Sequence, residues 1–289
     1  MDTIISEVDP DPQWQLIATS ERGPRAENQD NYLFITNKGQ YEHLVDEKKQ
    51  TGILKNWPEG HTRLVIADGM GGHNNGRQAA EAVVKALLKL DFQSEPQALR
   101  DQLNLIHNQL FEQFHQGART PGSTLVMADI APSGKAVIAN IGDSRAYLYH
   151  KKTWKLITRD HSEAEFAYRD NEISEADYAK SLLHNSNRIV QAMVFGSSGI
   201  IANKAGVKTR QHLQELRIEL EKDVFIQTIK AGDILMLASD GLWSGKDHYV
   251  SPLSIATDLS NYAKQQIEDA LETTQDNVSF VIYYNQKIF

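Results

Sequence analysis

Cysteine is absent from the 289 residues of this chain. A chain without cysteine forms no disulfide framework and binds no metal through thiolates. It also has no thiolate nucleophile, so every mechanism that needs a cysteine nucleophile is excluded.

Long apolar runs are missing as well. No segment approaches the run of about 18 apolar residues that a transmembrane helix needs. The first residues, Met1 to Glu7, lack the basic stretch and apolar run of a secretory signal peptide. We therefore expect a cytoplasmic protein that does not bind membranes.

Positive charge is scarce. Lys and Arg number 30 against 38 Asp and Glu, which gives a net charge of −8 and a pI near 5.7. Such a surface repels a phosphate backbone unless its basic residues gather in one patch. The nearest basic run, Lys48-Lys49, is too short, and Lys151-Lys152 is interpreted as a turn on a solvated face. Nucleic acid is not expected as a partner.

What is present is the composition of an ordinary globular protein. Hydrophobic residues make up 40% and charged residues 24% of the chain, enough to form a sizeable core. The sequence has no internal repeat, low-complexity tract or linker composition. We expect residues 1–289 to form a single domain.

The first third of the chain contains strand and helix patterns. Strands are expected at 14–20 and 62–67. Residues 37–60 between them carry glycine, proline and many charges, so we expect an irregular loop. Helices are expected at 78–88 and 96–115. The second helix would bury one apolar face, made of Leu99, Leu103, Ile106, Leu110 and Phe114.

Three short β-like runs follow at 123–130, 135–141 and 145–150, separated by turn sequences. They predict an antiparallel meander. A polar helix is expected at 162–183, and residues 196–222 are interpreted as a mobile insertion.

The last part of the chain predicts strands at 224–228, 234–238 and 278–284, with a helix at about 252–272. Strands come in runs and helices in pairs, unlike the regular alternation of a doubly wound fold. We expect an α+β fold in which a sandwich of sheets is flanked by helices.

Five aspartates stand at predicted strand ends beside glycine, asparagine or serine: Asp30, Asp68, Asp143, Asp240 and Asp276. One interpretation is that each is an ordinary turn residue. Five such sites in one chain favour a different one, in which the carboxylates converge at the rim of the sheets. Clustered carboxylates repel one another unless a cation offsets them, so convergence implies bound metal.

The ligand set points to a hard cation. Oxygen ligands favour Mg²⁺, Mn²⁺ or Ca²⁺, and the ten histidines show no metal-binding spacing. Gly69 lets the backbone approach closely, so its carbonyl can bind one ion while Asp68 bridges two.

Seven motifs occur in a fixed order between about residues 20 and 282. They are G-P-R-A-E-N-Q-D, A-D-G-M-G-G-H-N-N-G, P-G-S-T-L-V, I-G-D-S-R-A-Y, R-D-H-S, A-S-D-G-L-W and Q-D-N-V-S. With these motifs the chain resembles the bacterial branch of the type 2C metal-dependent serine/threonine protein phosphatases (PPM/PP2C). The resemblance implies a four-layer α-β-β-α sandwich, two antiparallel sheets flanked by helix pairs.

The resemblance also implies a Mn²⁺ or Mg²⁺ centre with two core ions. Asp68 would bridge them and Gly69 would bind one through its carbonyl, while Asp240 and Asp276 would hold the other. Asp30 would act through bound water. Asp143 with Asp240 would form a third, weaker site.

Catalysis would depend on Asp68 and on Arg25, whose guanidinium suits two phosphate oxygens. The implied reaction is in-line attack by a metal-bridging hydroxide without a covalent intermediate. Met70 stands where some relatives have a histidine proposed as general acid. We expect metal-bound water to donate the proton, with His73 as the alternative.

Residues from about 162 to 222 correspond to the family's flap, which contacts substrate, and 196–222 look longer than usual. The expected partners are phosphorylated proteins, with the chain opposing a serine/threonine kinase, as in bacterial signalling. We expect a monomer.

Two other functions stay open. One is a catalytically silent phosphoprotein-binding regulatory module, although Asp68, Asp240 and Asp276 are all present. The other is hydrolysis of a small-molecule phosphate ester, such as a nucleotide or a sugar phosphate.

Overall fold

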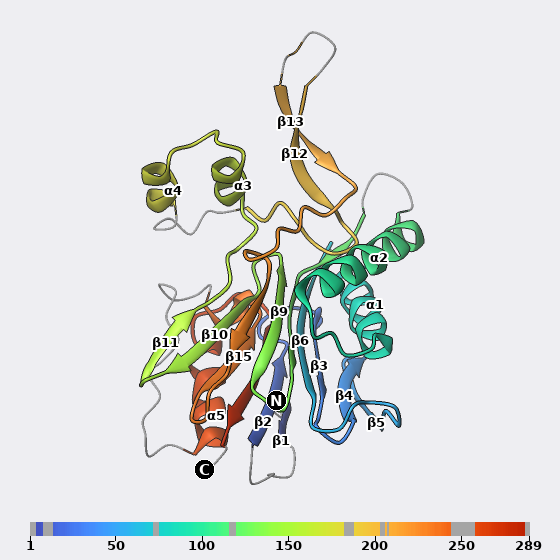
Figure 1. Cartoon of the computed structure of the whole chain (residues 1–289), viewed down its shortest axis with the longest axis vertical. Coiled ribbons are helices and arrows are strands. Elements are labelled where there is room, and N and C mark those ends of the chain that lie inside the picture. Colours follow the sequence, from blue (N-terminus) through green and yellow to red (C-terminus); the bar gives the residue numbers. More distant parts are fainter. Residues whose placement is uncertain are drawn as a thin grey trace.

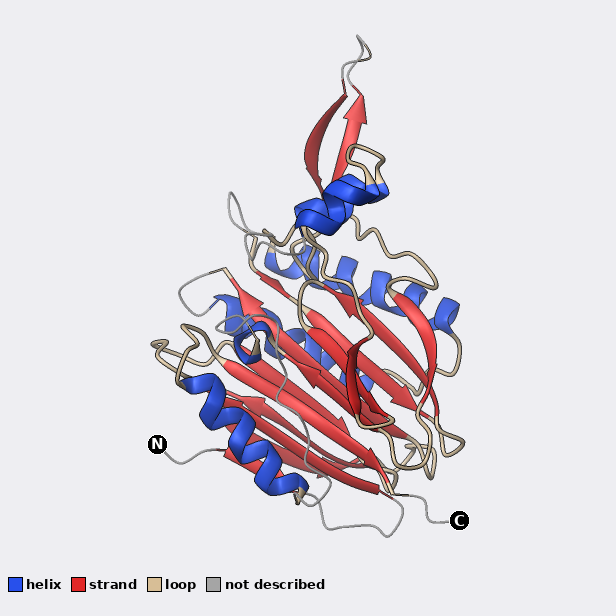
Figure 2. Ribbon diagram, turned by 90° about the vertical axis from the view of Figure 1, so that its left-hand side faces the viewer, coloured by secondary structure: helices blue, strands red, loops and turns tan. Residues whose placement is uncertain are grey.

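The computed structural model describes residues 4–7, 14–71, 75–115, 120–181, 188–202, 206, 208–243 and 258–286. Two antiparallel sheets lie face to face between layers of helix (Figures 1 and 2). The six-stranded sheet has the order β1 (Ile4–Glu7), β2 (Trp14–Glu21), β16 (Val278–Asn285), β15 (Ile234–Ala238), β10 (Arg145–His150) and β11 (Thr153–Leu156).

The second sheet has eight strands. Its order is β14 (Val224–Thr228), β9 (Lys135–Ile141), β8 (Leu125–Ile130), β6 (Thr62–Met70), β3 (Asp30–Ile35), β4 (Gln40–Val45) and β5 (Lys48–Ile53), and β7 (Gly122–Ser123) pairs with β6. Helices α1 (Asn75–Lys89) and α2 (Pro96–Phe114) pack on its outer face, whereas α5 (Leu259–Leu271) covers the other sheet.

Alternate residues of the central strands enter different apolar layers. In β6, Leu64 and Ile66 lie between the sheets, whereas Val65 and Ala67 pack under α1 and α2. In β16, Val281 lies between the sheets and Phe280 packs under α5. Because side chains alternate along a strand, both faces of each sheet are buried.

The predicted sandwich of sheets and helices is confirmed. The part of the expected 252–272 helix before residue 258 lies outside the described residues. No helix in the described ranges is both long and apolar enough to cross a membrane.

The prediction of an irregular loop at 37–60 was wrong, because this segment contains the hairpin β4–β5. Strand β4 pairs with β3 and buries Leu44, and Asp46 and Glu47 turn the chain with φ of 47° and 61°. Of the charges that suggested a loop, Lys48 and Lys49 lie on β5, which is almost entirely exposed, and Asp46 and Glu47 lie in the exposed turn before it. A solvated edge strand accepts polar residues that a central strand would reject.

The predicted meander was wrong at its third strand. β8 and β9 pair as expected, but β10 pairs with β15 in the other sheet. The turn at Gly142, where φ is 108°, therefore carries the chain from one sheet to the other. This crossing places Asp143 where the two sheets meet.

The flap region also differs from prediction. In place of the single helix predicted at 162–183, the described residues up to 181 form two short helices, α3 (Glu163–Arg169) and α4 (Glu175–Ser181), because the chain turns at Asn171 with φ of 58°. The segment 196–222, interpreted as a mobile insertion, contains the hairpin β12 (Ser197–Ala202) and β13 (Lys208–Leu213), and its mobility stays a prediction. This hairpin stands off the sandwich (Figures 1 and 2).

Candidate metal centre

The five predicted aspartates come together at one edge of the sandwich. Asp30 opens β3 directly opposite Asp68 in β6. Asp240 follows β15, Asp276 precedes β16 and Asp143 lies in the turn between β9 and β10. Because both sheets end at this edge, carboxylates that are far apart in the sequence lie close in space.

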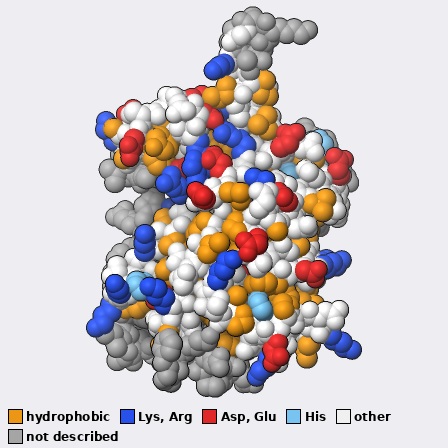
Figure 3. Space-filling model, in the orientation of Figure 1, with side chains coloured by type: hydrophobic (Ala, Val, Ile, Leu, Met, Phe, Trp, Pro, Cys, Tyr) orange, Lys and Arg blue, Asp and Glu red, His pale blue; other side chains and the backbone are white. Residues whose placement is uncertain are grey.

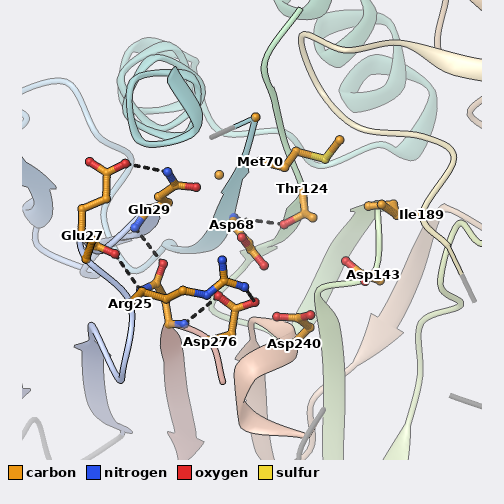
Figure 4. Close-up of a pocket in the computed structure, with 14 residues that line it drawn as sticks. Arg25, Glu27, Gln29, Asp68, Met70, Thr124, Asp143, Ile189, Asp240 and Asp276 are labelled. Carbon is orange, nitrogen blue, oxygen red and sulfur yellow. Dashed lines mark hydrogen bonds and ion pairs between the residues drawn. The ribbon is translucent and has the colours of Figure 1, made fainter. Parts of the chain in front are cut away.

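All of these aspartates except Asp30 line an open pocket of about 730 Å³. Figure 4 shows the carboxyl groups of Asp68, Asp240 and Asp276 near one another, with Asp143 beside Ile189. The predicted residues that line the pocket are Arg25, Asp68, Gly69, Asp143, Asp240 and Asp276. Asp30 is buried, and one of its oxygens accepts a hydrogen bond of 2.7 Å from Ser239 Oγ.

The carboxyl groups are strongly perturbed. Burial, followed by repulsion from neighbouring aspartates, raises the pKa of Asp143 to about 8 and that of Asp68 well above its usual range. Burial likewise raises the pKa of Asp30 to about 7 and that of Asp240 to about 6. Without a cation the carboxyl groups of Asp68 and Asp143 would keep their protons at neutral pH, so a divalent ion would offset the mutual repulsion of the cluster.

The carboxylate oxygens also need partners. Asp30 Oδ1 and Asp240 Oδ1 are buried without a hydrogen bond, which is costly unless an ion or water completes the site. In the described part of the chain, no three carboxylate or histidine side chains are close enough to hold an ion by themselves. A hard cation here would take its remaining oxygens from the Gly69 carbonyl and water. The residues present fit Mn²⁺ or Mg²⁺.

Gly69 has a packing role beside its predicted carbonyl role. A Cβ at this position would lie 2.3 Å from the carbonyl oxygen of Gly76 and 2.7 Å from that of Gln29. Gly69 N also donates to the Gln29 carbonyl at 3.1 Å. Only glycine lets β6 lie this close to the start of α1.

Arg25 lies at the pocket mouth. Its Nη2 donates to Asp276 Oδ2 at 2.6 Å and its Nε donates to the Gln275 carbonyl at 2.9 Å. The side chain is 54% exposed, which leaves the guanidinium accessible to a phosphate (Figure 4). The predicted phosphate ligand and a predicted metal ligand therefore form an ion pair.

Sequence reasoning missed two residues that hold the site in place. Thr124 Oγ1 accepts a hydrogen bond from Asp68 N at 3.0 Å and lies 2.6 Å from Ser144 Oγ. Asn277 Oδ1 accepts from Gln29 N at 2.9 Å, and its Nδ2 donates to the Arg22 and Glu27 carbonyls. Both residues lie in motifs that were recognised. Their side chains are neutral, so the sequence pattern did not mark them as residues of the site.

Two more residues of the recognised motifs, Met70 and His161, have definite places. Met70 lines the pocket, whereas His73 lies outside the described residues. His161, at the start of the flap, is fully buried, and its Nδ1 accepts from Gly142 N at 3.2 Å. His161 therefore links the turn that carries Asp143 to the flap.

The chain is similar to known bacterial phosphatases. The family model for protein phosphatase 2C matches residues 54–277. The serine/threonine phosphatase stp of Listeria welshimeri is 30% identical over 221 residues, 72% of this chain and 76% of that protein. A putative protein phosphatase of Mycoplasma genitalium is 27% identical over 291 residues, 93% of this chain and 94% of that protein.

Solved structures share the fold. The serine/threonine phosphatase of S. agalactiae superposes with a TM-score of 0.63 at 20% identity, covering 94% of this chain and 99% of that one. The catalytic domain of the phosphatase PstP, in complex with two manganese ions, superposes with a TM-score of 0.57 at 21% identity, covering 94% and 98%. Since the family match spans most of the sequence, this chain belongs to the protein phosphatase 2C family and is a phosphoprotein phosphatase.

Proposed function

We propose that this chain hydrolyses phosphoserine and phosphothreonine in proteins, using two divalent cations held at the sandwich edge. The observation that carries the proposal is the pocket itself, where partly buried carboxylates with raised pKa values surround a space beside Arg25. The manganese ions in PstP support Mn²⁺ as a cofactor.

Each residue has a proposed role. Asp68 would bridge the two ions, with the Gly69 carbonyl on one and Asp240 and Asp276 on the other. Asp30, buried behind Asp68, would orient bound water. Asp143, which lines the pocket beside Ile189, would form a weaker third site together with Asp240.

When bound, the cations would activate a bridging water for in-line attack on phosphorus and neutralise the developing charge. The chain's own contribution is positioning. Arg25 would bind two phosphate oxygens through its planar fork. The thioether of Met70 has no proton to give, so we propose that water protonates the leaving oxygen.

A phosphorylated protein is the favoured substrate. The pocket is open at the surface, where a side chain projecting from a protein can enter. The relatives' names give the same substrate class, and a serine/threonine kinase would be the opposing enzyme. Hydrolysis of a small phosphate ester is the second candidate, because Arg25 and the pocket would accept any phosphate monoester.

The test is phosphate release with Mn²⁺ from a phosphothreonine peptide, from a nucleotide monophosphate and from a sugar phosphate. We expect the peptide to be hydrolysed with far higher kcat/KM, and chelation of the metal to abolish turnover. Equal rates on all three compounds would favour the small-ester function. Binding of the peptide without turnover at any metal concentration would indicate the silent module.

A further inference from the structure

The hairpin β12–β13 is a two-stranded ribbon in the flap region, where substrate contact is expected in general but the ribbon itself has no assigned part. In the described part of the chain its two strands pair with each other, from Ser197↔Leu213 to Ala202↔Lys208, and with no other strand. Beyond its base the ribbon has exposed residues, among them Ile201, Lys208 and Thr209, that other molecules can contact.

The ribbon is firmly anchored at its base. Arg217 donates to the Ser198 carbonyl at 3.1 Å and pairs with Asp170 at 2.7 Å. The ring of His212 lies 4.7 Å from that of Phe195. These contacts fix the direction of the ribbon, so a partner that binds it loses little additional freedom.

The base of the ribbon lies at the rim of the metal pocket. Phe195 and Met70 both pack against Gly122, where an added Cβ would lie 2.9 Å from Phe195 Cβ and 3.1 Å from Met70 Cγ. Met70 and Ile189 line the pocket. A protein whose phosphorylated side chain entered the pocket would extend past this ribbon, whereas a small phosphate would not reach it.

The ribbon carries basic residues on one face. Lys208, Arg210 and His212 alternate along β13 and so project to the same side. Neither strand contains Asp or Glu, although the chain as a whole has a net charge of −8. In Figure 3, Lys and Arg side chains gather where the ribbon meets the flap helices.

The lower part of this face already binds carboxylates. Arg210 forms ion pairs with Asp170 at 2.9 Å and with Glu172, both at the end of α3. Lys208 lies two residues further out and is exposed. An acidic segment from outside the chain would continue the same pattern of ion pairs along the ribbon.

We propose that the β12–β13 ribbon is a docking arm for an acidic segment of the phosphoprotein substrate, next to the phosphorylated residue. The inference rests on the proposed function and adds the charge of the substrate. Catalysis on small phosphates does not need the arm, since no residue of the ribbon lines the pocket.

The test uses phosphothreonine peptides that differ only in a flexible tail of about eight glutamates or about eight glutamines, long enough to span about 26 Å when extended. Each tail is attached at either end of the same core peptide. We expect the glutamate tail, at one end, to lower KM by about threefold to tenfold, with kcat unchanged and the effect weakened by salt.

Two variants locate the effect. Lys208→Glu reverses the exposed charge, with Lys155→Glu on exposed β11 as the matched control. A shortened ribbon replaces Ala202 to Lys208 by Asn-Gly, a two-residue hairpin turn that keeps the Ile201↔Thr209 pair and Arg210. Both ribbon variants should lose the tail preference and keep wild-type kcat/KM on p-nitrophenyl phosphate, whereas Lys155→Glu should keep both.

The outcomes separate the two proposals. A wild-type protein without tail preference, or a preference that survives in both ribbon variants, overturns the docking arm and leaves the phosphatase function intact. If no phosphothreonine peptide is hydrolysed, the proposed function fails, and fluorescence anisotropy with unphosphorylated tail peptides still tests the arm. Equal anisotropy for glutamate and glutamine tails would then reject it.

Discussion

The aspartates inside this protein have two kinds of surroundings: some pair with cationic side chains, and others lie beside further carboxylates. Asp129, in β8, pairs with Arg63 at 2.6 Å, and both side chains are completely buried. Asp223 pairs with Arg169 at 2.7 Å and with His161 at 3.0 Å. In the metal pocket, by contrast, Asp68 faces Asp30 across two paired strands.

The difference appears in the pKa values. Burial alone would raise the pKa of Asp223, but hydrogen bonds from His161 and Arg169 outweigh it and hold that pKa well below its usual range. Burial and neighbouring carboxylates instead raise the pKa of Asp68. The fold supplies its own cations for these structural carboxylates, and we propose that an external ion offsets the charge of Asp68 and its neighbours.

The largest expected effect comes from removing a carboxylate that pairs with a buried arginine. Asp129→Ala should lower the free energy of unfolding by about 3–5 kcal/mol, because it leaves the Arg63 guanidinium buried without its carboxylate. Urea unfolding followed by tryptophan fluorescence measures the change. Asp101→Ala, at an exposed ion pair with Arg100, is the control and should show no measurable change. An unaltered unfolding curve for Asp129→Ala would show that Arg63 needs no carboxylate partner.

The second prediction concerns two aspartates of the proposed metal centre. Asp68→Ala and Asp240→Ala should each reduce turnover of a phosphothreonine peptide with Mn²⁺ at least about a hundredfold, since each removes a shared metal ligand. Without metal, the free energy of unfolding should stay unchanged or rise, because one repelling carboxylate is gone. Near wild-type turnover in either variant would remove that residue from the metal centre.

The third prediction concerns Arg25, the cationic side chain at the mouth of the pocket. Arg25→Ala should raise KM for the phosphothreonine peptide about tenfold, with a smaller fall in kcat, because a phosphate clamp acts in both ground and transition states. Arg25→Lys should restore only part of the affinity, since lysine lacks the planar fork. Steady-state kinetics at saturating Mn²⁺ measure both constants, and an unchanged KM would exclude Arg25 from phosphate binding.

The smallest expected effect concerns Asp143. Asp143→Ala should lower turnover about fivefold while calorimetry still detects two core ions, because a site with fewer carboxylates binds its ion more weakly. Loss of both core ions would place Asp143 among their direct ligands. Unchanged occupancy and rate at saturating Mn²⁺ would deny the third ion any part in catalysis.

The sequence by itself determined the parts that depend on local patterns. Alternating and continuous apolar runs predicted most central strands, and the helical spacing of Leu99, Leu103 and Leu110 predicted α2 with its buried face. The motifs around Asp68, Asp240 and Asp276 predicted a shared site. Such motifs can be recognised in the sequence because an aspartate beside glycine at a strand end is a local pattern of only a few residues.

Tertiary structure decided which strands pair and which distant groups form hydrogen bonds. β5 is a strand only because β4 pairs with it, and β10 joins β15 because the chain crosses between sheets at Gly142. Thr124 and Asn277 bond backbone groups that are distant in sequence. Strand pairing and neutral hydrogen bonds join residues far apart along the chain, so no local pattern specifies them. The β12–β13 ribbon and its basic face emerged in the same way, from the pairing of two exposed strands.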